Sequence, residues 1–182
     1  MSINITTPLT KEKTANLKAG DIVNLTGTIY TSRDAAHKRM IEEYEKTGKF
    51  PFDMENAIIY YAGPSPAKPN QVIGSAGPTT SGRMDAYAPF MIEKGETGMI
   101  GKGARNENVI NAMKKHTAVY FGATGGAGAL ISSHIKKCEL IAYEDLGAEA
   151  VYKLYVENFP LVVIIDCEGN NLYETEKLKY QK

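Results

Sequence analysis

Cysteine is scarce in this sequence: Cys138 and Cys167 are the only two among 182 residues, and they do not form a CxxC pair. Two separate thiols cannot by themselves hold an iron–sulfur cluster or a closed structural zinc site. Cys138 falls on an apolar helical pattern and Cys167 closes an apolar strand pattern, so we expect both to pack in the core. The sequence predicts no metal site and no cofactor bound by this chain.

An excess of charge is also absent, because Lys plus Arg and Asp plus Glu number 21 each. The chain therefore has no global basic field that would favour nucleic acid as a partner. No apolar run approaches the ~20 residues of a membrane span. Residues 1–13 are polar and lack the hydrophobic region of a signal peptide. We expect no nucleic-acid or membrane partner and a cytoplasmic location.

The size and composition fit one globular domain. Apolar residues make up 43% of the chain and charged residues 23%, which is ordinary for a soluble domain with one core. The sequence has neither an internal repeat nor a low-complexity segment. We therefore treat residues 1–182 as a single domain, and we expect the lysine-rich tail after residue 171 to be frayed.

Hydrophobic periodicity alternates between strand and helix patterns, which predicts the α/β class. The residues Val23, Leu25 and Ile29 alternate as in a strand, and a helical stripe follows from Asp34 to Lys46. We expect further strands at 57–61, 71–75, 98–103, 118–122, 151–156 and 161–166. We expect further helices at 86–94, 106–115 and from 125 to about 138.

The stretch from Gly77 to Asp85 reads Gly-Pro-Thr-Thr-Ser-Gly-Arg-Met-Asp and is the richest polar loop in the chain. Gly and Pro predict a loop, which we expect to leave the strand at 71–75. Arg83 offers a planar fork for a carboxylate or phosphate, and Thr79, Thr80 and the loop amides could complete an anion pocket. The alternative is a solvated turn whose hydroxyls bond its own backbone.

A second polar cluster precedes and opens the helix at 34–46. Ser32 is a candidate N-cap, and Asp34 suits the positive end of the helix dipole. Arg33, beside free helix N–H groups, would make a second anion site. His37 is four residues further along, so we expect it to project from the same face as Arg33. The alternative is that Asp34 is only a first-turn acid and His37 a half-exposed helix residue.

Two glycine-rich stretches resemble nucleotide loops only in part. Lys102 lies between two glycines, but the chain lacks the Gly and the Ser/Thr that a phosphate-binding loop requires around it. Lys102 is then either a ligand-binding residue or a solvated surface charge. Gly126 and Gly128 begin a dinucleotide fingerprint whose third glycine is replaced by Ile131. Close packing of a helix on the sheet explains these glycines better.

Six motifs occur together, in the order Thr26-Gly27 with 33–39, Gly63-Pro64, Gly77–Thr80 with 83–85, Gly101–Gly103, Gly125-Gly126 and 146–150. This set resembles the β subunit of the iron–sulfur class I fumarate hydratases, which corresponds to the C-terminal domain of the fused forms. Tartrate dehydratase β subunits belong to the same family. The resemblance covers about residues 7–173.

The resemblance implies a layered β/β/α swivelling domain and a reversible hydration of fumarate to L-malate. In such enzymes a 4Fe–4S cluster is held by three cysteines of an α subunit and binds the substrate. The resemblance therefore implies an α-subunit partner, a small dicarboxylate substrate, and a hetero-oligomer with two copies of each subunit. The chain would be active only together with that α subunit.

The resemblance also assigns roles to residues of the loops described above. Arg33, Arg83 and Lys102 correspond to substrate-carboxylate contacts, and Thr79 to the proposed catalytic base. From the residues themselves we add Thr80 as a substrate contact. A threonine is a weak base, so nearby positive charge must favour its deprotonated form.

Two further residues join Thr79 in the predicted catalytic group. Asp34 is a candidate to orient Thr79, as is Asp85. His37 matches the motif, and its role is open.

Other functions in the same family, and one outside it, stay open. The residues Met84 and Asp85, and the stretch 149–151, favour the fumarase branch. A tartrate or methylfumarate-type dehydratase subunit is the alternative, because these substrates differ only at the middle carbons. A non-catalytic binding or assembly domain is a further alternative, although a scaffold has no need of this polar set.

Overall fold

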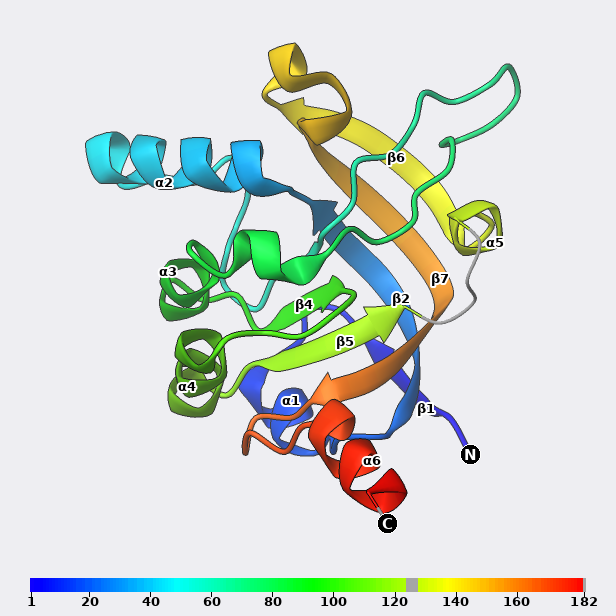
Figure 1. Ribbon diagram of the computed structural model, residues 1–182. Helices are drawn as coiled ribbons and strands as arrows, with labels where there is room; N and C mark the ends of the chain where they lie inside the picture. The colour runs from blue at the N-terminus through cyan, green and yellow to red at the C-terminus, as the bar shows by residue number, and fades with distance from the viewer. Residues whose placement is uncertain (124–127, 182) are drawn as a thin grey trace.

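The computed structural model describes residues 1–123 and 128–181 (Figure 1). Its strands are β1 (Ile3–Thr6), β2 (Ile22–Thr31), β3 (Ile58–Tyr60), β4 (Gly98–Gly101), β5 (Val119–Ala123), β6 (Ile135–Ala142) and β7 (Val151–Ile165). Its α-helices are α1 (Lys11–Ala15), α2 (Asp34–Thr47), α3 (Ala88–Glu93), α4 (Glu107–His116), α5 (Gly128–Ser132) and α6 (Leu172–Tyr180). Two 3₁₀ helices complete the set, η1 (Ser81–Met84) and η2 (Glu144–Glu149).

The strands form one seven-stranded sheet in the order β1-β2-β3-β4-β5-β7-β6, and β2 also pairs with β7. Strands β2, β3, β4, β5 and β7 therefore close into a ring. Within it, β2, β3, β4 and β5 run parallel, whereas β7 is antiparallel to both β2 and β5. The predicted α/β class is confirmed.

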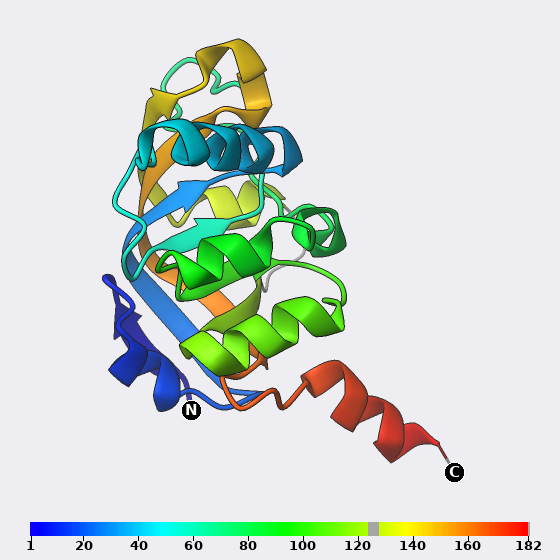
Figure 2. The same ribbon diagram turned by 90° about the vertical axis from the view of Figure 1, so that its left-hand side faces the viewer.

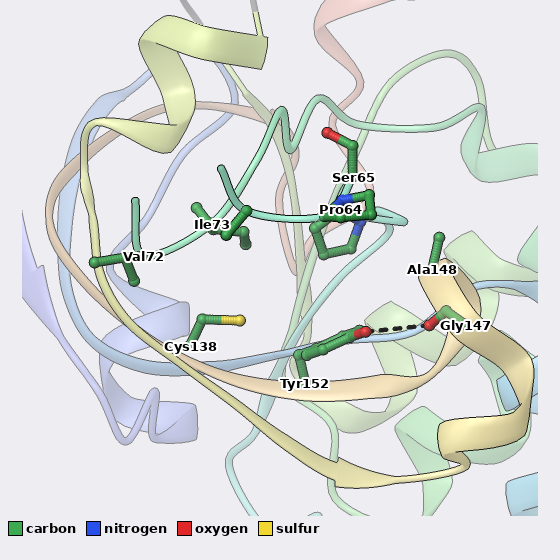
Figure 3. Close-up of a pocket in the computed structure, with 10 residues that line it drawn as sticks. Pro64, Ser65, Val72, Ile73, Cys138, Gly147, Ala148 and Tyr152 are labelled. Atoms are coloured by element: carbon green, nitrogen blue, oxygen red, sulfur yellow. Dashed lines mark hydrogen bonds between the residues drawn. The ribbon is translucent and has the colours of Figure 1, made fainter. Parts of the chain in front are cut away.

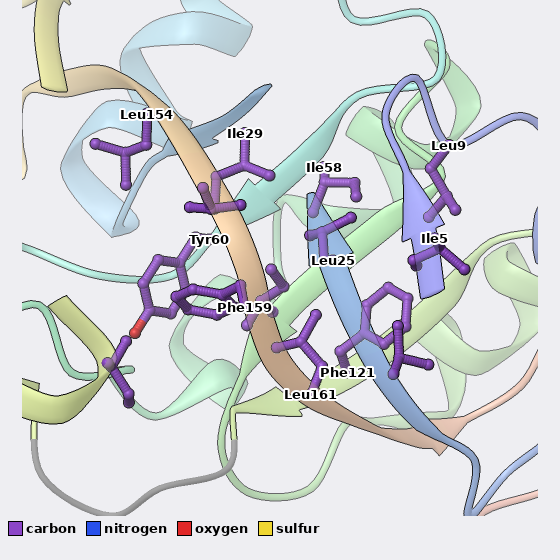
Figure 4. Packing of buried hydrophobic residues seen from close by; sticks show 14 of the residues in the cluster. Ile5, Leu9, Leu25, Ile29, Ile58, Tyr60, Phe121, Leu154, Phe159 and Leu161 are labelled. Carbon is purple, nitrogen blue, oxygen red and sulfur yellow. The ribbon is translucent and has the colours of Figure 1, made fainter. Parts of the chain in front are cut away.

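Two hydrophobic cores lie on the two faces of this sheet. Along β3 and at the residue that follows it, Ile58 and Tyr60 belong to the core inside the ring, and Ile59 and Tyr61 belong to the core under the helices. Such alternation follows from the period of two in a strand. Figure 4 shows the interior cluster, and Figure 2 shows α2, α3 and α4 stacked on the outer face. The result is a helical layer over a sheet that folds over its own core, as the β/β/α expectation requires.

Helix α2 begins and ends close to its predicted limits. Asp34 occupies its first turn, and Gly48 ends it in the left-handed conformation with φ of 70°. Helix α4 is preceded by Asn106, whose side chain accepts a hydrogen bond from Val109 N at 3.0 Å. These capping interactions satisfy backbone groups that a helix end leaves free. No helix of the described residues is long and apolar enough to cross a membrane.

Two predicted elements are wrong. Residues 71–75 form no strand but part of a long loop between β3 and η1. The helix expected to reach Cys138 ends at Ser132, where the hydroxyls of Ser132 and Ser133 bond carbonyls of α5. Cys138 lies on β6, half-buried and packed against the interior core. The β6 register against β7 overrides the helical pattern, which is a tertiary effect.

The two strands predicted at 151–156 and 161–166 form one strand, β7. The polar residues between the two predicted strands form a β-bulge opposite residues 25–27 of β2, so the strand continues through them. Asn158, within this bulge, has a φ of 48°. Residues 172–180 form α6, where fraying was expected, because the side chain of Asn171 caps its start. Cys167 follows β7 and is half-buried rather than in the core.

Candidate functional site

The candidate residues lie on loops at one edge of the parallel sheet. Arg33 and Asp34 follow β2, the loop that ends in η1 follows β3, and Lys102 follows β4. Carboxyl ends of neighbouring parallel strands meet at the same edge of a sheet, and both open sheets and closed barrels of the α/β class place ligand sites there. The structure thus brings together most of the residues that the sequence singled out.

The threonine loop is attached to two strand ends by its backbone. Thr79 N donates to the carbonyl of Tyr61 at 2.7 Å, and Ser81 N donates to the carbonyl of Lys102 at 2.8 Å. Thr80 pairs with Lys102 in an isolated parallel bridge. The Thr79 side chain is half-buried, whereas Thr80 and Lys102 are exposed. Hydroxyls and an ammonium group therefore share one small, backbone-fixed surface.

Next to this surface lies a cluster of two guanidinium groups and two carboxylates. Arg83 NH2 donates to Asp34 Oδ2 at 2.9 Å. Arg33 Nε lies 4.0 Å from Asp34 Oδ1 and 3.5 Å from Glu149 Oε1. Arg83 keeps 53% of its side chain exposed, and Arg33 keeps 23%. Both arginines therefore retain N–H groups for an additional anion.

The ionised form of Asp34 is favoured in this cluster. Burial would raise the pKa of Asp34, but the backbone N–H at the helix start and the two arginines outweigh it. The pKa is therefore held below its usual value. Glu149 was quoted among the family motifs but not predicted as a site residue. Its pairing with Arg33 needs η2 to fold against α2, which no local pattern indicates.

Ser32 and His37 are placed differently from the prediction. Arg33 is the N-cap residue of α2 and makes no side-chain capping bond, so the assignment of Ser32 as N-cap is wrong. The Ser32 hydroxyl lies 2.7 Å from His37 Nδ1, which is also 3.0 Å from the carbonyl of Arg33. Because Arg33 lies outside the helix, it does not share a helical face with His37.

His37 is completely buried, not half-exposed. Its ring meets the ring of Tyr61 edge-on at 5.5 Å between centroids. Burial lowers the pKa of His37 to about 4, so the ring is neutral near pH 7. The assignment of His37 to the catalytic group stays a prediction, and in this chain the residue lies beneath the site.

The side chain of Asp85 turns away from the threonine loop. Its Oδ1 accepts a hydrogen bond from Arg105 Nε at 2.7 Å, and its Oδ2 accepts one from Asn106 N at 2.7 Å. Within the described residues, neither Asp34 nor Asp85 bonds the Thr79 hydroxyl. Sequence reasoning missed Arg105, because nothing in the chain nearby marks it as a partner of Asp85.

A cavity of about 330 Å³ lies beside the charged cluster, under the long loop (Figure 3). The described residues that line it carry no charge, and Pro64, Ile73 and Tyr152 make it mainly apolar. At Gly63 the loop passes so close to Arg33 that an added Cβ would lie 3.1 Å from its NH1. The cavity adjoins the cluster, and its described lining adds hydroxyl groups of Ser65 and Tyr152 but no cation that would pair with a carboxylate.

No three His, Cys, Asp or Glu side chains gather to hold a metal ion in residues 1–123 and 128–181. The glycines at 125 and 126, which belong to the quoted motifs and to the rejected nucleotide fingerprint, lie outside the described residues.

Comparison with known proteins gives the family of this chain. Residues 1–176 match the family described as "Fumarase C-terminus". A putative L(+)-tartrate dehydratase subunit beta of Methanocaldococcus jannaschii is 41% identical over 181 residues, which cover 96% of this chain and 93% of the relative.

Two fumarate hydratases match a smaller part of themselves. The mitochondrial fumarate hydratase 1 of Leishmania major is 41% identical over 84% of this chain and 28% of its own length. The aerobic class I fumarate hydratase of Escherichia coli K12 is 37% identical over 86% of this chain and 29% of its own length. This chain thus spans less than a third of these two enzymes. The chain belongs to the fumarase C-terminus family, which includes C-terminal parts of class I fumarate hydratases and a tartrate dehydratase β subunit.

Proposed function

We propose that this chain is the β subunit of an iron–sulfur hydro-lyase that reversibly hydrates fumarate to L-malate. The observation that carries the proposal is a pair of arginines, the half-buried Arg33 and the exposed Arg83, that flank Asp34 beside a surface of threonine and lysine. Two separate forks suit the two ends of a dicarboxylate, because each guanidinium can bind a carboxylate through two N–H groups. Membership of the family supports the same reading.

Charge balance indicates how the substrate would be held. The two arginines of the cluster are balanced by Asp34 and Glu149, and Lys102 adds one positive charge beside them. A doubly charged substrate needs more positive charge than this. We therefore propose that the α subunit supplies the remainder when it covers this edge of the sheet.

Thr79 is the proposed base of the reaction. Its backbone is fixed by Tyr61, so the hydroxyl would keep a constant position as substrate binds. The nearby cations would lower the proton affinity of the Thr79 oxygen and so increase the fraction of deprotonated hydroxyl that can act as a base near neutral pH. Asp34 is bonded to Arg83, and we therefore assign it the orientation of that guanidinium rather than of Thr79.

A 4Fe–4S cluster on the partner would supply a Lewis acid for the substrate hydroxyl. Cys138 lies on β6, where it lines the apolar cavity under the long loop, and Cys167 follows β7, so the two thiols are separate and neither is part of the charged cluster. The chain therefore offers substrate contacts, and we propose that all cluster ligands come from the α subunit. A complex with two copies of each subunit, located in the cytoplasm, completes the proposal.

Tartrate dehydration is the second candidate reaction. The relative from Methanocaldococcus jannaschii, which matches over 93% of its own length, is named a putative L(+)-tartrate dehydratase subunit beta. The carboxylate contacts described above would serve tartrate as well as fumarate. A methylfumarate-type substrate remains in the comparison for the same reason.

The test is a hydration and dehydration assay on the complex with the α subunit, prepared without oxygen. Arg83→Lys keeps the charge and loses the fork, so kcat/KM for the true substrate should fall about 10- to 100-fold. Arg39→Lys is the matched control, because Arg39 forms a two-bond pair with Asp145 on exposed surface. The control should stay within about twofold.

The outcomes separate the candidates. Turnover of fumarate, tartrate or methylfumarate alone would select the substrate. A complex with an intact cluster that acts on none of them would overturn the hydratase proposal and favour a binding or assembly domain. Hydration by the isolated chain would overturn the two-subunit proposal.

A further inference from the structure

Arg105 is a buried charge directly beneath the candidate site. It lies between β4 and α4, and its side chain is 0% exposed. Its guanidinium donates to Asp85 Oδ1 at 2.7 Å and to the Tyr61 hydroxyl at 3.2 Å. A buried charge is costly unless it is paired and hydrogen-bonded, so each of these contacts constrains the position of its partner.

Two aromatic rings enclose the same guanidinium. Its central carbon lies 5.1 Å from the ring centroid of Tyr61 and 4.9 Å from that of Tyr120. A planar cation between two rings is restricted in rotation as well as in position. Arg105 therefore fixes two tyrosines and one aspartate at once, which a lysine could not do.

Asp85 extends this restraint to the segment that carries Arg83. It immediately follows η1, the 3₁₀ turn that carries Arg83. Its second oxygen accepts a hydrogen bond from Asn106 N at 2.7 Å, which joins η1 to the start of α4. The direction in which Arg83 leaves the surface is thus set by a carboxylate held from below.

The two tyrosines transmit the restraint to the threonine loop. The carbonyl of Tyr61 holds Thr79 N at 2.7 Å. The Tyr120 hydroxyl lies 2.8 Å from the Ser81 hydroxyl and donates to the carbonyl of Gly103 at 2.9 Å. Ser81 and Gly103 directly flank the pair formed by Thr80 and Lys102.

The end of β4 and the loop that ends in η1 are in close contact. An added Cβ at Gly101 would overlap the Ser81 hydroxyl, so the strand end and η1 are in direct contact. Every loop that carries Thr79, Thr80, Arg83 or Lys102 is therefore one hydrogen bond away from a group that Arg105 touches.

We propose that Arg105 is the positioning residue of this site. From beneath, it sets the mutual distance of the anion-binding groups on the η1 loop and the Lys102 loop, and it does not itself contact the substrate. The inference rests on the proposed function for its consequence in turnover. Its structural part, the coupling of the η1 loop and the Lys102 loop through one guanidinium, stands independently.

The test compares Arg105→Lys and Tyr61→Phe with the unaltered full chain by amide hydrogen exchange. Tyr61→Phe keeps the ring and removes one hydrogen bond, so it serves if Arg105→Lys does not fold. We expect the amide hydrogens of Thr79 and Ser81 to exchange at least about tenfold faster in the variants than in the unaltered chain. The reason is that loss of a hydrogen bond to a charged group makes local opening of the loop more favourable by at least this factor. Amides that join β2 to β7 should be unchanged.

Asp166→Asn is the matched control. Asp166 is 1% exposed, accepts several hydrogen bonds and lies at the far end of β7. It should speed exchange around residues 19 and 170 and leave the threonine loop protected. Uniform acceleration in Tyr61→Phe, or a threonine loop that exchanges as before, would overturn the proposal.

The same variants in the complex separate this proposal from the proposed function. If the chain binds a dicarboxylate as proposed, Tyr61→Phe should raise KM and lower kcat, because binding and reacting groups shift together. If Tyr61→Phe changes only the thermal stability and leaves KM and kcat unchanged, Arg105 has a purely structural role in the core and does not position the site. An inactive unaltered complex with loop-specific exchange changes would overturn the hydratase function and support the positioning role.

Discussion

Arg83 and Asp34 form a hydrogen bond of 2.9 Å across 49 residues of sequence, and it joins η1 to the first turn of α2. The same carboxylate lies 4.0 Å from Arg33, so one aspartate stands between both proposed substrate arginines. Asp34 therefore both orients the guanidinium groups and competes with any anion they bind.

Replacing Asp34 with Asn should separate these two effects. In the isolated chain, removal of the competing charge should tighten malonate binding about three- to tenfold, as measured by NMR titration at the loops near residues 32 and 82. In the complex, kcat should fall because Arg83 loses its orientation. Weaker malonate binding by the variant would contradict the competition argument. The Asp145→Asn variant, which removes an exposed partner of Arg39, serves as the control.

Replacing Thr79 with Val tests the proposed base. The substitution keeps the shape and removes the hydroxyl. Loss of a general base typically lowers turnover by about 10²–10⁴-fold, whereas loss of one neutral hydrogen bond lowers it less than about tenfold. We expect the larger loss for Thr79→Val and the smaller one for Thr80→Val. If Thr79→Val retains turnover within tenfold with its cluster intact, the base lies elsewhere, and His37 is the next residue to replace.

His37 should make the chain less stable in mild acid. Its folded pKa of about 4 lies below the ordinary 6.5, so the folded state favours the neutral ring. The stabilisation is complete above about pH 6.5 and is lost as the pH falls toward 4, in total about 3 kcal/mol. Urea unfolding at pH 7.5, 6 and 5 measures the slope. His37→Phe should flatten it, and an unchanged slope in that variant would assign the effect to another group.

Glu96 should have the opposite pH dependence. It is completely buried, neither carboxylate oxygen has a hydrogen-bond partner among the described residues, and burial raises its pKa well above the usual value. Its contribution to stability is therefore greatest at low pH and declines as the pH rises above about 4.5. Glu96→Gln should raise the melting temperature at pH 8 more than at pH 5. Glu93→Gln, on exposed surface, should change it equally little at both.

Much of the site follows from local sequence. Arg33 and Arg83 can be predicted from the residues as anion-binding groups, because both stand on polar loops that follow strands, and such loops converge at one edge of a parallel sheet. For Lys102 the residues leave a ligand-binding role and a surface charge open, and the family resemblance favours the first. The sequence predicts the strand at 57–61, but it also predicts a strand at 71–75, within the long loop to Thr79, that does not form. The error did not alter the site, since the loop is held by Tyr61 rather than by a strand of its own.

The remainder depends on tertiary contacts that leave no periodic signal. Arg105 and Asp85 are 20 residues apart, and neither has a neighbour that marks it as buried. His37 looked half-exposed because only the packing of α2 against Tyr61 and Tyr87 removes it from water. On β6, the adjacent exposed residues Lys136 and Lys137 interrupt the strand alternation where the register against β7 shifts, so the pattern of the segment is typical of a helix.

The closure of the ring by β7 has a consequence for how the protein is made. In β7, Val162 pairs with Ile22 of β2 and Lys153 pairs with Tyr30 of β2. β2, which is synthesised early, therefore cannot complete its pairing until β7 has been synthesised. The residues up to the end of β7 must leave the ribosome before Leu25 and Ile29 can be buried against the side chains of β7. Folds dominated by such distant pairings fold on the slow side, in about milliseconds to seconds. Until β7 is added, we expect the nascent chain to expose the unpaired edges of β2 and β5 and the hydrophobic residues inside the ring. Such exposed surface favours binding by chaperones.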